Sequence, residues 1–338
     1  MPFEHAVIER LRSGGDLAAG QMTGFMADLI DGKLSDDEIV AFLLALRGRG
    51  EKTPDLVEAA AIMRSRCVSL ELFEPNLVDT CGTGGDGQGT LNASTLAALV
   101  AAAAGARVAK HGNRSVSGIF GSADLLEALG IRIELTPREA ARSIEQTGFG
   151  FLFAPLFHPA MKHAASARKK IAGKTLFNCL GPLTNPAGAK RHLIGVYDRN
   201  LLAPFAEALK TLGSTHALIV HGDDGLDEVT LSGLTHVTEL RHGAIHAYTI
   251  SPEALGVPRA PLERLRCRNR EEAFEAAQIV LDGGEGPRTD FVVLNAAFAL
   301  KAAGLLEDPR EGVSEARSLL REGAVRRKAE AIRGLFPR

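Results

Sequence analysis

The chain has 338 residues and a formal net charge of −2, with acidic and basic residues interspersed. This length favours one large domain with a smaller companion. Because no basic stripe is present, the composition argues against a dedicated nucleic-acid-binding protein. The four cysteines lie far apart and form no CxxC pair, which argues against a structural zinc site or a disulfide framework.

Acidic residues also shape expectations for the N-terminus. Glu4, Glu9 and Asp16 lie among its apolar residues, so we expect no signal peptide. The longest apolar stretch, Leu96 to Ala106, is too short to span a bilayer. The sequence therefore predicts a cytoplasmic protein without a membrane segment.

The predicted elements begin with a helical region. From Val7 to about Arg66, apolar residues recur at spacings of three and four. Ser35 and Glu38 predict a capping box at the start of the third helix. After Pro75, short apolar runs alternate with alanine-rich helical stretches, as in a parallel sheet covered on both faces. The candidate strands are Asn76 to Asp79, Arg107 to Ala109, Phe151 to Ala154, Leu193 to Val196 and Ala217 to Val220.

These patterns predict an α/β protein with a small all-helical N-terminal domain and a large domain around a mostly parallel central sheet. We expect the small domain to cover residues 1–72 and the large domain to cover residues 73–168 and 188–338. Residues 169–187 break the alternation with Gly173, Gly181, Pro182 and Pro186, so this segment is expected to leave the sheet domain.

A glycine-rich stretch, GTGGDG, follows the first predicted strand. Gly82, Gly84 and Gly87 satisfy the spacing GxGxxG. A dinucleotide site would need the helix to begin inside this motif and a carboxylate about 20 positions later. Lys110 and His111 stand near that offset, which weakens the dinucleotide interpretation.

Asn92, Ser94 and Thr95 surround the start of the next predicted helix, where free backbone N–H groups favour an anion such as phosphate. The alternative is that Asn92 or Ser94 is only an N-cap.

The second strand runs into KHGNRSVS, beginning at Lys110, and then into Ser122. Cations, hydroxyls and glycines beside the first loop suit a ligand with several phosphate groups. The alternative is a solvated basic turn.

Asp227 and Glu228 follow the strand Ala217 to Val220 and offer the hard oxygen ligands that magnesium takes when it also coordinates phosphates. The alternative is a solvated acidic loop. However, all three loops leave the carboxyl ends of apolar strands, which share one edge of a parallel sheet. We therefore expect phosphate donors and metal ligands to face one crevice.

His158 and Arg168 lie in and after the run FAPLFHPAMK. A guanidinium pairs bidentately with a carboxylate, so the two residues are candidates for binding an aromatic acid. Spacing alone does not establish this role.

The motifs GTGGDG, NAST, KHGNRSVS, GSAD, FAPLFHPAMK, FNCLGPLTNP and DGLDE occur in this order, and together they resemble the anthranilate phosphoribosyltransferase family of tryptophan biosynthesis. The match runs from about Leu34 to Ala303. The resemblance implies transfer of the phosphoribosyl group of phosphoribosyl pyrophosphate (PRPP) to the amine of anthranilate, with release of pyrophosphate. It also implies a homodimer, two Mg²⁺ ions per subunit bound with PRPP between hinged domains, and a return of residues 169–187 to the helical domain.

The resemblance further implies the site residues. Lys110 and His111 take catalytic roles; no general base is obligatory, and His111 and the carboxylate of the substrate are the two candidates. The implied metal contacts are Ser94, Asp227 and Glu228. The implied anthranilate contacts are Gly82, Asn113, His158, Arg168 and Gly181, with Pro182 shaping the entrance. The implied PRPP contacts are Gly82, Gly85, Asp86, Thr90, Asn92, Ala93, Ser94, Thr95, Lys110, His111, Gly112, Asn113, Arg114, Ser115, Val116, Ser117, Gly118 and Ser122.

Two positions depart from the family pattern. Gly118, Ile119 and Phe120 replace a serine-rich stretch, so side-chain contacts to phosphate from these positions are in doubt. Lys174 stands where the family often has arginine, and a bidentate role there would be lost.

Three other functions are alternatives. A pyrimidine-nucleoside phosphorylase shares the fold, but Asp227, Glu228 and the GPLTNP segment favour the transferase. A non-catalytic, nucleic-acid-binding relative should have lost the metal carboxylates and gained a basic face. A purely structural protein would have no reason to keep phosphate-type and metal-type loops on one sheet edge.

Overall fold

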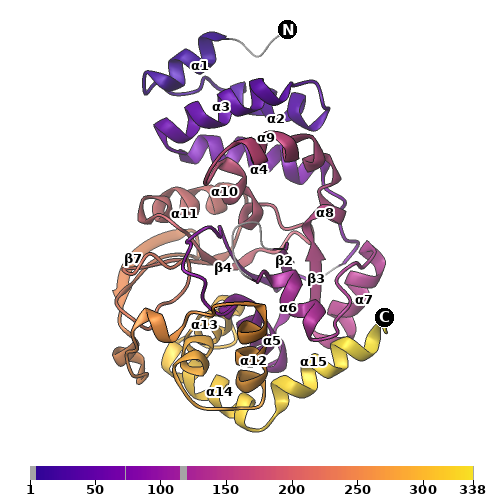
Figure 1. Ribbon diagram of the computed structural model, residues 1–338, viewed down its shortest axis with the longest axis vertical. Coiled ribbons are helices and arrows are strands. Elements are labelled where there is room, and N and C mark those ends of the chain that lie inside the picture. The colour runs from indigo at the N-terminus through magenta and orange to yellow at the C-terminus, as the bar shows by residue number, and fades with distance from the viewer. Residues whose placement is uncertain (1–4, 73, 115–119, 338) are drawn as a thin grey trace.

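The computed structural model describes residues 5–72, 74–114 and 120–337, and it has a helical part stacked on an α/β part (Figure 1). The helical part confirms the predicted N-terminal helices, and its apolar stripes face inward, where the rings of Phe25 and Phe42 stack 3.8 Å apart. The predicted capping box is present at Ser35, whose side chain accepts from Glu38 N. Its helices are α1 His5–Arg12, α2 Gln21–Ile30, α3 Asp36–Arg49 and α4 Thr53–Arg66.

The α/β part is built on a seven-stranded sheet in the order β3-β2-β1-β4-β5-β6-β7. The first five strands in this order are parallel, whereas β6 and β7 join as an antiparallel hairpin at one edge. The five predicted strands all overlap observed ones, and the hairpin is an addition that the sequence pattern did not predict. The strands are β1 Leu77–Gly82, β2 Arg107–Gly112, β3 Phe149–Phe153, β4 Arg191–Gly195, β5 His216–Gly222, β6 Thr235–Arg241 and β7 Ala244–Ile250.

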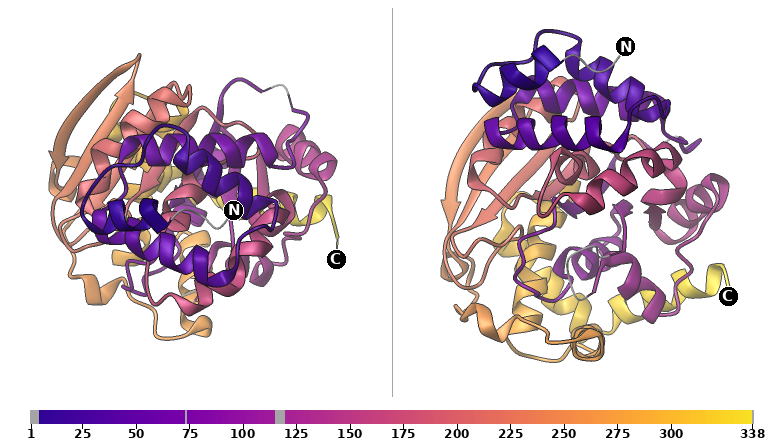
Figure 2. Two further views of the ribbon diagram at one scale, coloured as in Figure 1. Left: turned by 90° about the horizontal axis from the view of Figure 1, so that it is seen from above. Right: turned by 45° about the horizontal axis from the view of Figure 1, so that its top comes forward.

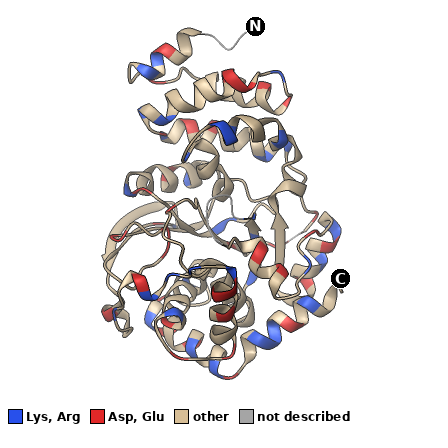
Figure 3. Cartoon of the chain, in the orientation of Figure 1, with Lys and Arg blue, Asp and Glu red and all other residues tan. Residues whose placement is uncertain are grey.

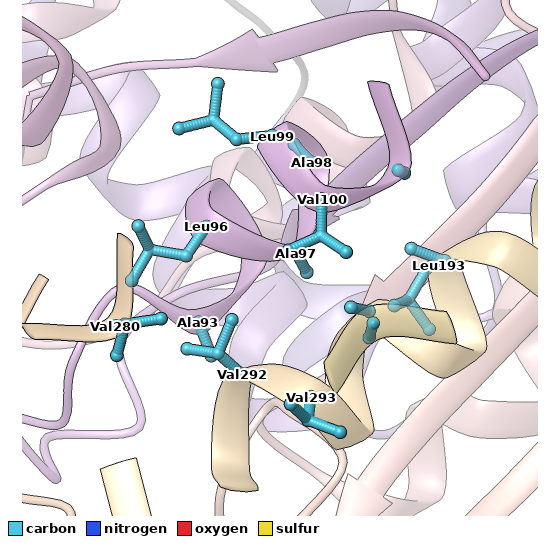
Figure 4. Close-up of a cluster of buried hydrophobic side chains, with 14 of the residues drawn as sticks. Ala93, Leu96, Ala97, Ala98, Leu99, Val100, Leu193, Val280, Val292 and Val293 are labelled. Atoms are coloured by element: carbon cyan, nitrogen blue, oxygen red, sulfur yellow. The ribbon is translucent and has the colours of Figure 1, made fainter. Parts of the chain in front are cut away.

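Both faces of the parallel strands are buried, which explains their continuous apolar runs. In β5, Leu218 and Val220 join the cluster on one face while Ala217 and Ile219 join the cluster on the other. The first face packs on α5, whose alanine-rich sequence allows close contact with α13; Figure 4 shows Ala93, Ala97, Val292 and Val293 at this contact. The helices on this side are α5 Ala93–Ala103, α12 Arg270–Leu281, α13 Pro287–Ala303, α14 Pro309–Arg321 and α15 Ala324–Leu335.

The second face packs on helices that continue into the helical part. α10 (Leu176–Leu183) and α11 (Leu202–Thr211) lie against α4, and α9 (Ala165–Lys170) lies against α3. Segment 165–183 is therefore next to the N-terminal helices in space although it is far from them in sequence (Figures 1 and 2). One apolar cluster runs from α1 through α10 to the sheet, so the two parts share buried surface.

Short elements complete the chain: α6 Ser122–Ala128, α7 Pro137–Thr147, α8 Ala154–Phe157, and the 3₁₀ turns η1 Pro159–Ala164, η2 Arg199–Leu201, η3 Pro252–Leu255 and η4 Leu262–Arg264. Acidic and basic residues are interspersed over both parts (Figure 3). Within the described ranges, no helix combines the length and the apolar character needed to cross a membrane.

Candidate active site

A cavity of about 1070 Å³ opens where the carboxyl ends of β1 and β2 meet helices α8 to α10. The loop after β5 and the turn at residues 266–268 close its other sides. Ligands of open α/β sheets bind outside the carboxyl ends of the strands, and the cavity has that position.

The glycine loop, residues 83–92, forms one wall of the cavity. Gly84, Gly85 and Gly87 have φ between 65° and 79°, a region that side chains disfavour. Glycine is also favoured sterically at position 82, just before the loop, because a Cβ there would overlap the Asp227 carboxylate. Helix α5 begins only at Ala93, after the loop, so GxGxxG does not open a helix and the dinucleotide interpretation fails.

The start of α5 is open toward the cavity. Asn92 occupies the N-cap position but makes no capping bond; its Nδ2 donates to Phe120 O at 2.8 Å. Its buried Oδ1 has no hydrogen-bond partner among the described residues. Ser94 N donates to Glu228 Oε1 at 3.2 Å. The simple N-cap interpretation is therefore wrong for Asn92, and the start of α5 already donates one hydrogen bond to a carboxyl group.

Lys110 lies on β2 and is 1% exposed. Its Nζ donates to Thr80 O and lies 3.3 Å from Ser94 Oγ. Burial lowers the pKa of Lys110, whereas the nearby charges of Asp79 and Glu228 raise it. The ammonium group is thus held beside the glycine loop and the start of α5.

His111 and His158 form a pair with ring centroids 5.1 Å apart. His111 Nδ1 lies 2.9 Å from Gly181 O, and His158 Nε2 lies 3.1 Å from Thr184 O. Because a carbonyl oxygen only accepts, these nitrogens carry hydrogen and the opposite nitrogens keep lone pairs. Burial, with a contribution from His158, lowers the pKa of His111 to about 3, so the ring is neutral near pH 7.

Asp86, Asp227 and Glu228 bring three carboxylates to one end of the cavity. Gly84 N donates to Asp227 Oδ2 at 2.7 Å. Burial and the charges of Asp86 and Glu228 raise the pKa of Asp227. Burial likewise raises the pKa of Glu228 to about 8. A bound cation would favour the charged forms of these carboxylates, so the residues fit a divalent metal.

The carboxylates cannot enclose a metal unaided. Among the described residues, no three His, Cys, Asp or Glu side chains converge in a metal-binding geometry. Mg²⁺ commonly takes one or two carboxylates and fills its other positions with water and substrate phosphates. The donor set therefore fits Mg²⁺ bound together with a phosphorylated ligand.

Arg168 on α9 faces the same cavity from the helical side. It is half-buried, its guanidinium lies 5.2 Å from the ring centre of Phe177, and partial burial lowers its pKa. No Asp or Glu among the described residues forms an ion pair with it. A cation without a partner beside apolar side chains and neutral histidines is suited to an aromatic carboxylate.

The structure brings most of the predicted site residues to this cavity. Ala93 and Thr95 are instead fully buried and do not belong to its lining, while Ser115, Val116, Ser117 and Gly118 lie outside the described residues. The functional roles of all these residues stay predictions. The predicted residues that line the cavity are Gly82, Gly85, Asp86, Thr90, Asn92, Ser94, Lys110, His111, Gly112, Asn113, Arg114, Ser122, His158, Arg168, Gly181, Asp227 and Glu228.

Lys174, which stands where the family often has arginine, makes a cation–π contact and not a bidentate one. Its Nζ lies 4.0 Å from the ring centre of Tyr197, and its aliphatic stem passes close to Gly85. It supports the glycine loop from behind and is not among the described lining residues.

Several residues near the site were missed by the sequence interpretation. Asp79 is fully buried and accepts from His111 N at 3.1 Å and from Asn185 Nδ2 at 2.8 Å, which ties the GPLTNP segment to the strand ends. Gln88 and Arg266 also line the cavity. A charged residue inside an apolar strand was a usable signal for Asp79, whereas nothing local distinguishes Arg266 from other exposed arginines.

Comparisons with known proteins agree with this geometry. Residues 74–326 match the glycosyl transferase family, a/b domain, and residues 5–67 match the glycosyl transferase family, helical bundle domain. Anthranilate phosphoribosyltransferase of Symbiobacterium thermophilum is 47% identical over 97% of this chain and 96% of the relative. The enzyme of the same name from Methanosarcina acetivorans is 45% identical over 96% of this chain and 88% of the relative.

Solved structures give the same result. Anthranilate phosphoribosyltransferase of Thermus thermophilus superposes with a TM-score of 0.90 at 43% identity, covering 99% of each chain. The Saccharomyces cerevisiae enzyme in complex with PRPP and Mg superposes with a TM-score of 0.88 at 26% identity, again covering 99% of each chain. The chain therefore belongs to the glycosyl transferase family and, within it, to the anthranilate phosphoribosyltransferases.

Proposed function

We propose that the cavity is the place where this chain performs the reaction of its family, the transfer of the phosphoribosyl group from PRPP to the anthranilate amine. The observation that carries the proposal is the division of one cavity between two ligand chemistries. The glycine loop, the start of α5 and the loop after β5 supply oxyanion donors and three carboxylates to its lining, and Arg168 with two neutral histidines lines it as well. The first set suits a polyphosphate with its metal, and the second suits an aromatic acid.

The metal assignment rests on the carboxylates and on related enzymes. We propose that Asp227, Glu228 and Ser94 hold Mg²⁺ together with the pyrophosphate of PRPP. In support, the yeast relative has been solved in complex with PRPP and Mg, and a variant of it has been solved with Mg bound. When bound, Mg²⁺ neutralises negative charge on the leaving pyrophosphate. The proposal includes two ions per subunit, as the family resemblance implies.

The reaction breaks the bond between the anomeric carbon and pyrophosphate, and the electron pair leaves with pyrophosphate. The ribose ring gains cationic character until the amine nitrogen forms the new C–N bond and loses a proton. Lys110 is positioned to stabilise charge on the phosphates. Nε2 of neutral His111 is buried and has no hydrogen-bond partner among the described residues, so its lone pair is available to accept a hydrogen bond from the amine. The proton acceptor is either this nitrogen or the carboxylate of anthranilate.

Arg168 and the surrounding histidines act by positioning. A bidentate pair between Arg168 and the anthranilate carboxylate would fix the amine in relation to the anomeric carbon. A yeast relative of 26% identity that covers 98% of this chain and 96% of its own was solved in complex with 4-fluoroanthranilate, with a TM-score of 0.86. It supports a site for this ligand class.

The broader organisation is also proposed. We assign residues 1–72 and 169–187 to the helical domain, with residues 73–168 and 188–338 in the α/β domain. The packing of α9 and α10 on α3 and α4 supports this division. We also propose a homodimer in the cytoplasm, on the basis of the family resemblance and the composition.

The test is the loss of anthranilate fluorescence when the purified protein is mixed with PRPP, with and without magnesium. We expect a loss that requires both PRPP and magnesium and is matched by released pyrophosphate. Binding of PRPP without any loss would point to another phosphoribosyl acceptor, and absence of PRPP binding would contradict the site assignment.

A further inference from the structure

Backbone pairing places Arg266 beside the glycine loop. Residues 265–267 form a short antiparallel bridge with residues 89–91, in which Leu91 N donates to Leu265 O at 3.2 Å and Cys267 N donates to Gly89 O at 2.8 Å. This bridge brings Arg266 opposite Thr90, where its side chain lines the cavity. A segment remote in sequence therefore contributes a cation to the glycine-loop wall.

The guanidinium of Arg266 uses only part of its hydrogen-bonding capacity within the described chain. Its Nη2 donates to Gln88 Oε1 at 2.7 Å, and no carboxylate of the described chain lies within ion-pair distance. Neighbouring arginines differ: Arg268 and Arg288 both pair with Glu272. Because arginine carries five N–H donors, one bond to an amide leaves several for a ligand in the cavity.

Gln88 connects Arg266 to the carboxylate end of the cavity. Its Nε2 donates to Asp224 O at 3.3 Å, on the loop that also carries Asp227. Its backbone N donates to Asp86 Oδ1 at 3.1 Å. Gln88 thus spans the glycine loop and the carboxylate loop, and it holds the guanidinium on the side of the cavity where the carboxylates lie.

We propose that Arg266 binds the pyrophosphoryl group of PRPP and that Gln88 positions it. This inference rests on the proposed function. A planar guanidinium matches two phosphate oxygens at once, and it supplies positive charge where three carboxylates and a polyphosphate would otherwise repel one another. We assign Arg266 to the pyrophosphoryl group because Gln88 is hydrogen-bonded to Asp86 and to the loop that carries Asp227, where the metal is proposed to bind.

The test compares Arg266→Gln with Arg264→Gln in the full chain. Arg264 is an exposed arginine two residues earlier and is outside the described lining of the cavity, so it serves as a matched control. In Arg266→Gln we expect KM for PRPP and the inhibition constant for pyrophosphate each to rise about tenfold or more. KM for anthranilate and the melting temperature should stay unchanged. Arg266→Lys keeps the charge without the fork and should be intermediate.

Gln88→Met tests the positioning role. Alone it should raise KM for PRPP less than Arg266→Gln does, and in the double variant it should add little, because both changes remove the same contact. Fully additive effects would overturn the role of Gln88. Equal kinetics of Arg266→Gln and Arg264→Gln, or a higher KM for PRPP with unchanged pyrophosphate inhibition, would overturn the role of Arg266. If the wild-type protein itself is inactive with PRPP and anthranilate, the proposed function fails instead.

Discussion

Two ionisable side chains of the cavity, Arg168 and Glu228, are individually unfavourable for folding. Arg168 has lost water without gaining an acidic partner among the described residues, and Glu228 lies near two other carboxylates. Such groups destabilise the free protein unless a ligand of opposite charge arrives. We interpret them as binding groups, because substitutions that remove their charge should affect ligands more than the fold.

Arg168→Gln should raise KM for anthranilate about tenfold or more while KM for PRPP changes little, because a charge-assisted pair with a carboxylate is lost. Steady-state kinetics with each substrate varied in turn will measure both constants. The control is Lys169→Gln, an exposed neighbour. A parallel loss of affinity for both substrates would contradict the assignment of Arg168.

Glu228→Gln should stabilise the metal-free protein and remove magnesium-dependent activity. The folded pKa of Glu228, about 8, is above the value in the unfolded chain. Its contribution to stability is therefore full at low pH and is lost as the pH rises toward and through 8. At pH 8 the variant should be more stable by about 4 kcal/mol in urea denaturation, and the difference should vanish near pH 4. A variant that is less stable than wild type at pH 8 would contradict this account.

At the scale of elements, the β6–β7 hairpin shows how the sheet ends. β6 pairs with β5 on the side away from β4, and β7 is mostly exposed because it is the edge strand. Glu239 on β6 is 7% exposed and accepts from Lys301 Nζ at 2.8 Å and Tyr248 Oη at 2.9 Å, while His216 lies at 3.0 Å. This network joins the hairpin to β5 and α13.

Glu239→Gln should weaken the hairpin in a pH-dependent way. Burial raises the pKa of Glu239, but hydrogen bonds from His216, Lys301 and Tyr248 outweigh it and lower the pKa to about 2. The stabilisation is thus present above the unfolded pKa and is lost as the pH falls toward 2. We expect a loss of about 2 kcal/mol at pH 7 that shrinks at pH 3, measured by urea denaturation.

Glu307→Gln is the matched control because Glu307 is exposed and pairs with Arg241 on the same strand. Exposed pairs contribute little, so this variant should unfold almost like wild type. Equal losses in the two variants would mean that burial of Glu239 is irrelevant.

The elements that the sequence predicted well are those whose side-chain period is clear. The N-terminal helices and the five parallel strands have buried stripes or buried faces that repeat locally. β6 and β7 were missed because Thr235–Arg241 mixes polar and apolar residues, and its burial depends on α13 and on the neighbouring strand. The side-chain partners of Asp79 could not be predicted either, since Asn185 is 106 positions away in sequence.

At the scale of the whole molecule, the cavity lies where the helical part meets the sheet edge. Arg168 comes from the helical side, and Asp227 and Glu228 come from the loop after β5, so ligands held by both would bridge the two parts. The shared apolar cluster joins these parts and reaches the cavity wall, where Phe177 and Leu180 belong to both. We therefore expect ligand binding to require both parts of the protein together, and neither part alone to bind the ligands.

Magnesium and PRPP should bind cooperatively. Because the described carboxylates do not enclose a metal, Mg²⁺ alone should show no saturable binding at low millimolar concentration, whereas PRPP should bind more tightly with Mg²⁺ than with EDTA. Titration calorimetry of each ligand with and without the other will measure the coupling. Asp227→Asn should abolish it, and tight binding of Mg²⁺ by itself would contradict shared coordination.

The sequence by itself determined the fold class, the glycine, phosphate-type and acidic loops, and their position after parallel strands, because these features follow from local periodicity and from the shared edge of a parallel sheet. Tertiary structure alone decided which residues meet. It brings Gly181 O within hydrogen-bond distance of His111 and Glu228 within hydrogen-bond distance of the start of α5. It also places Gln88 between Arg266 and the loop that carries Asp227. It also buried Thr95 and left Arg168 without an acidic partner among the described residues. Contacts between distant segments depend on packing of the whole chain, and no local pattern encodes them.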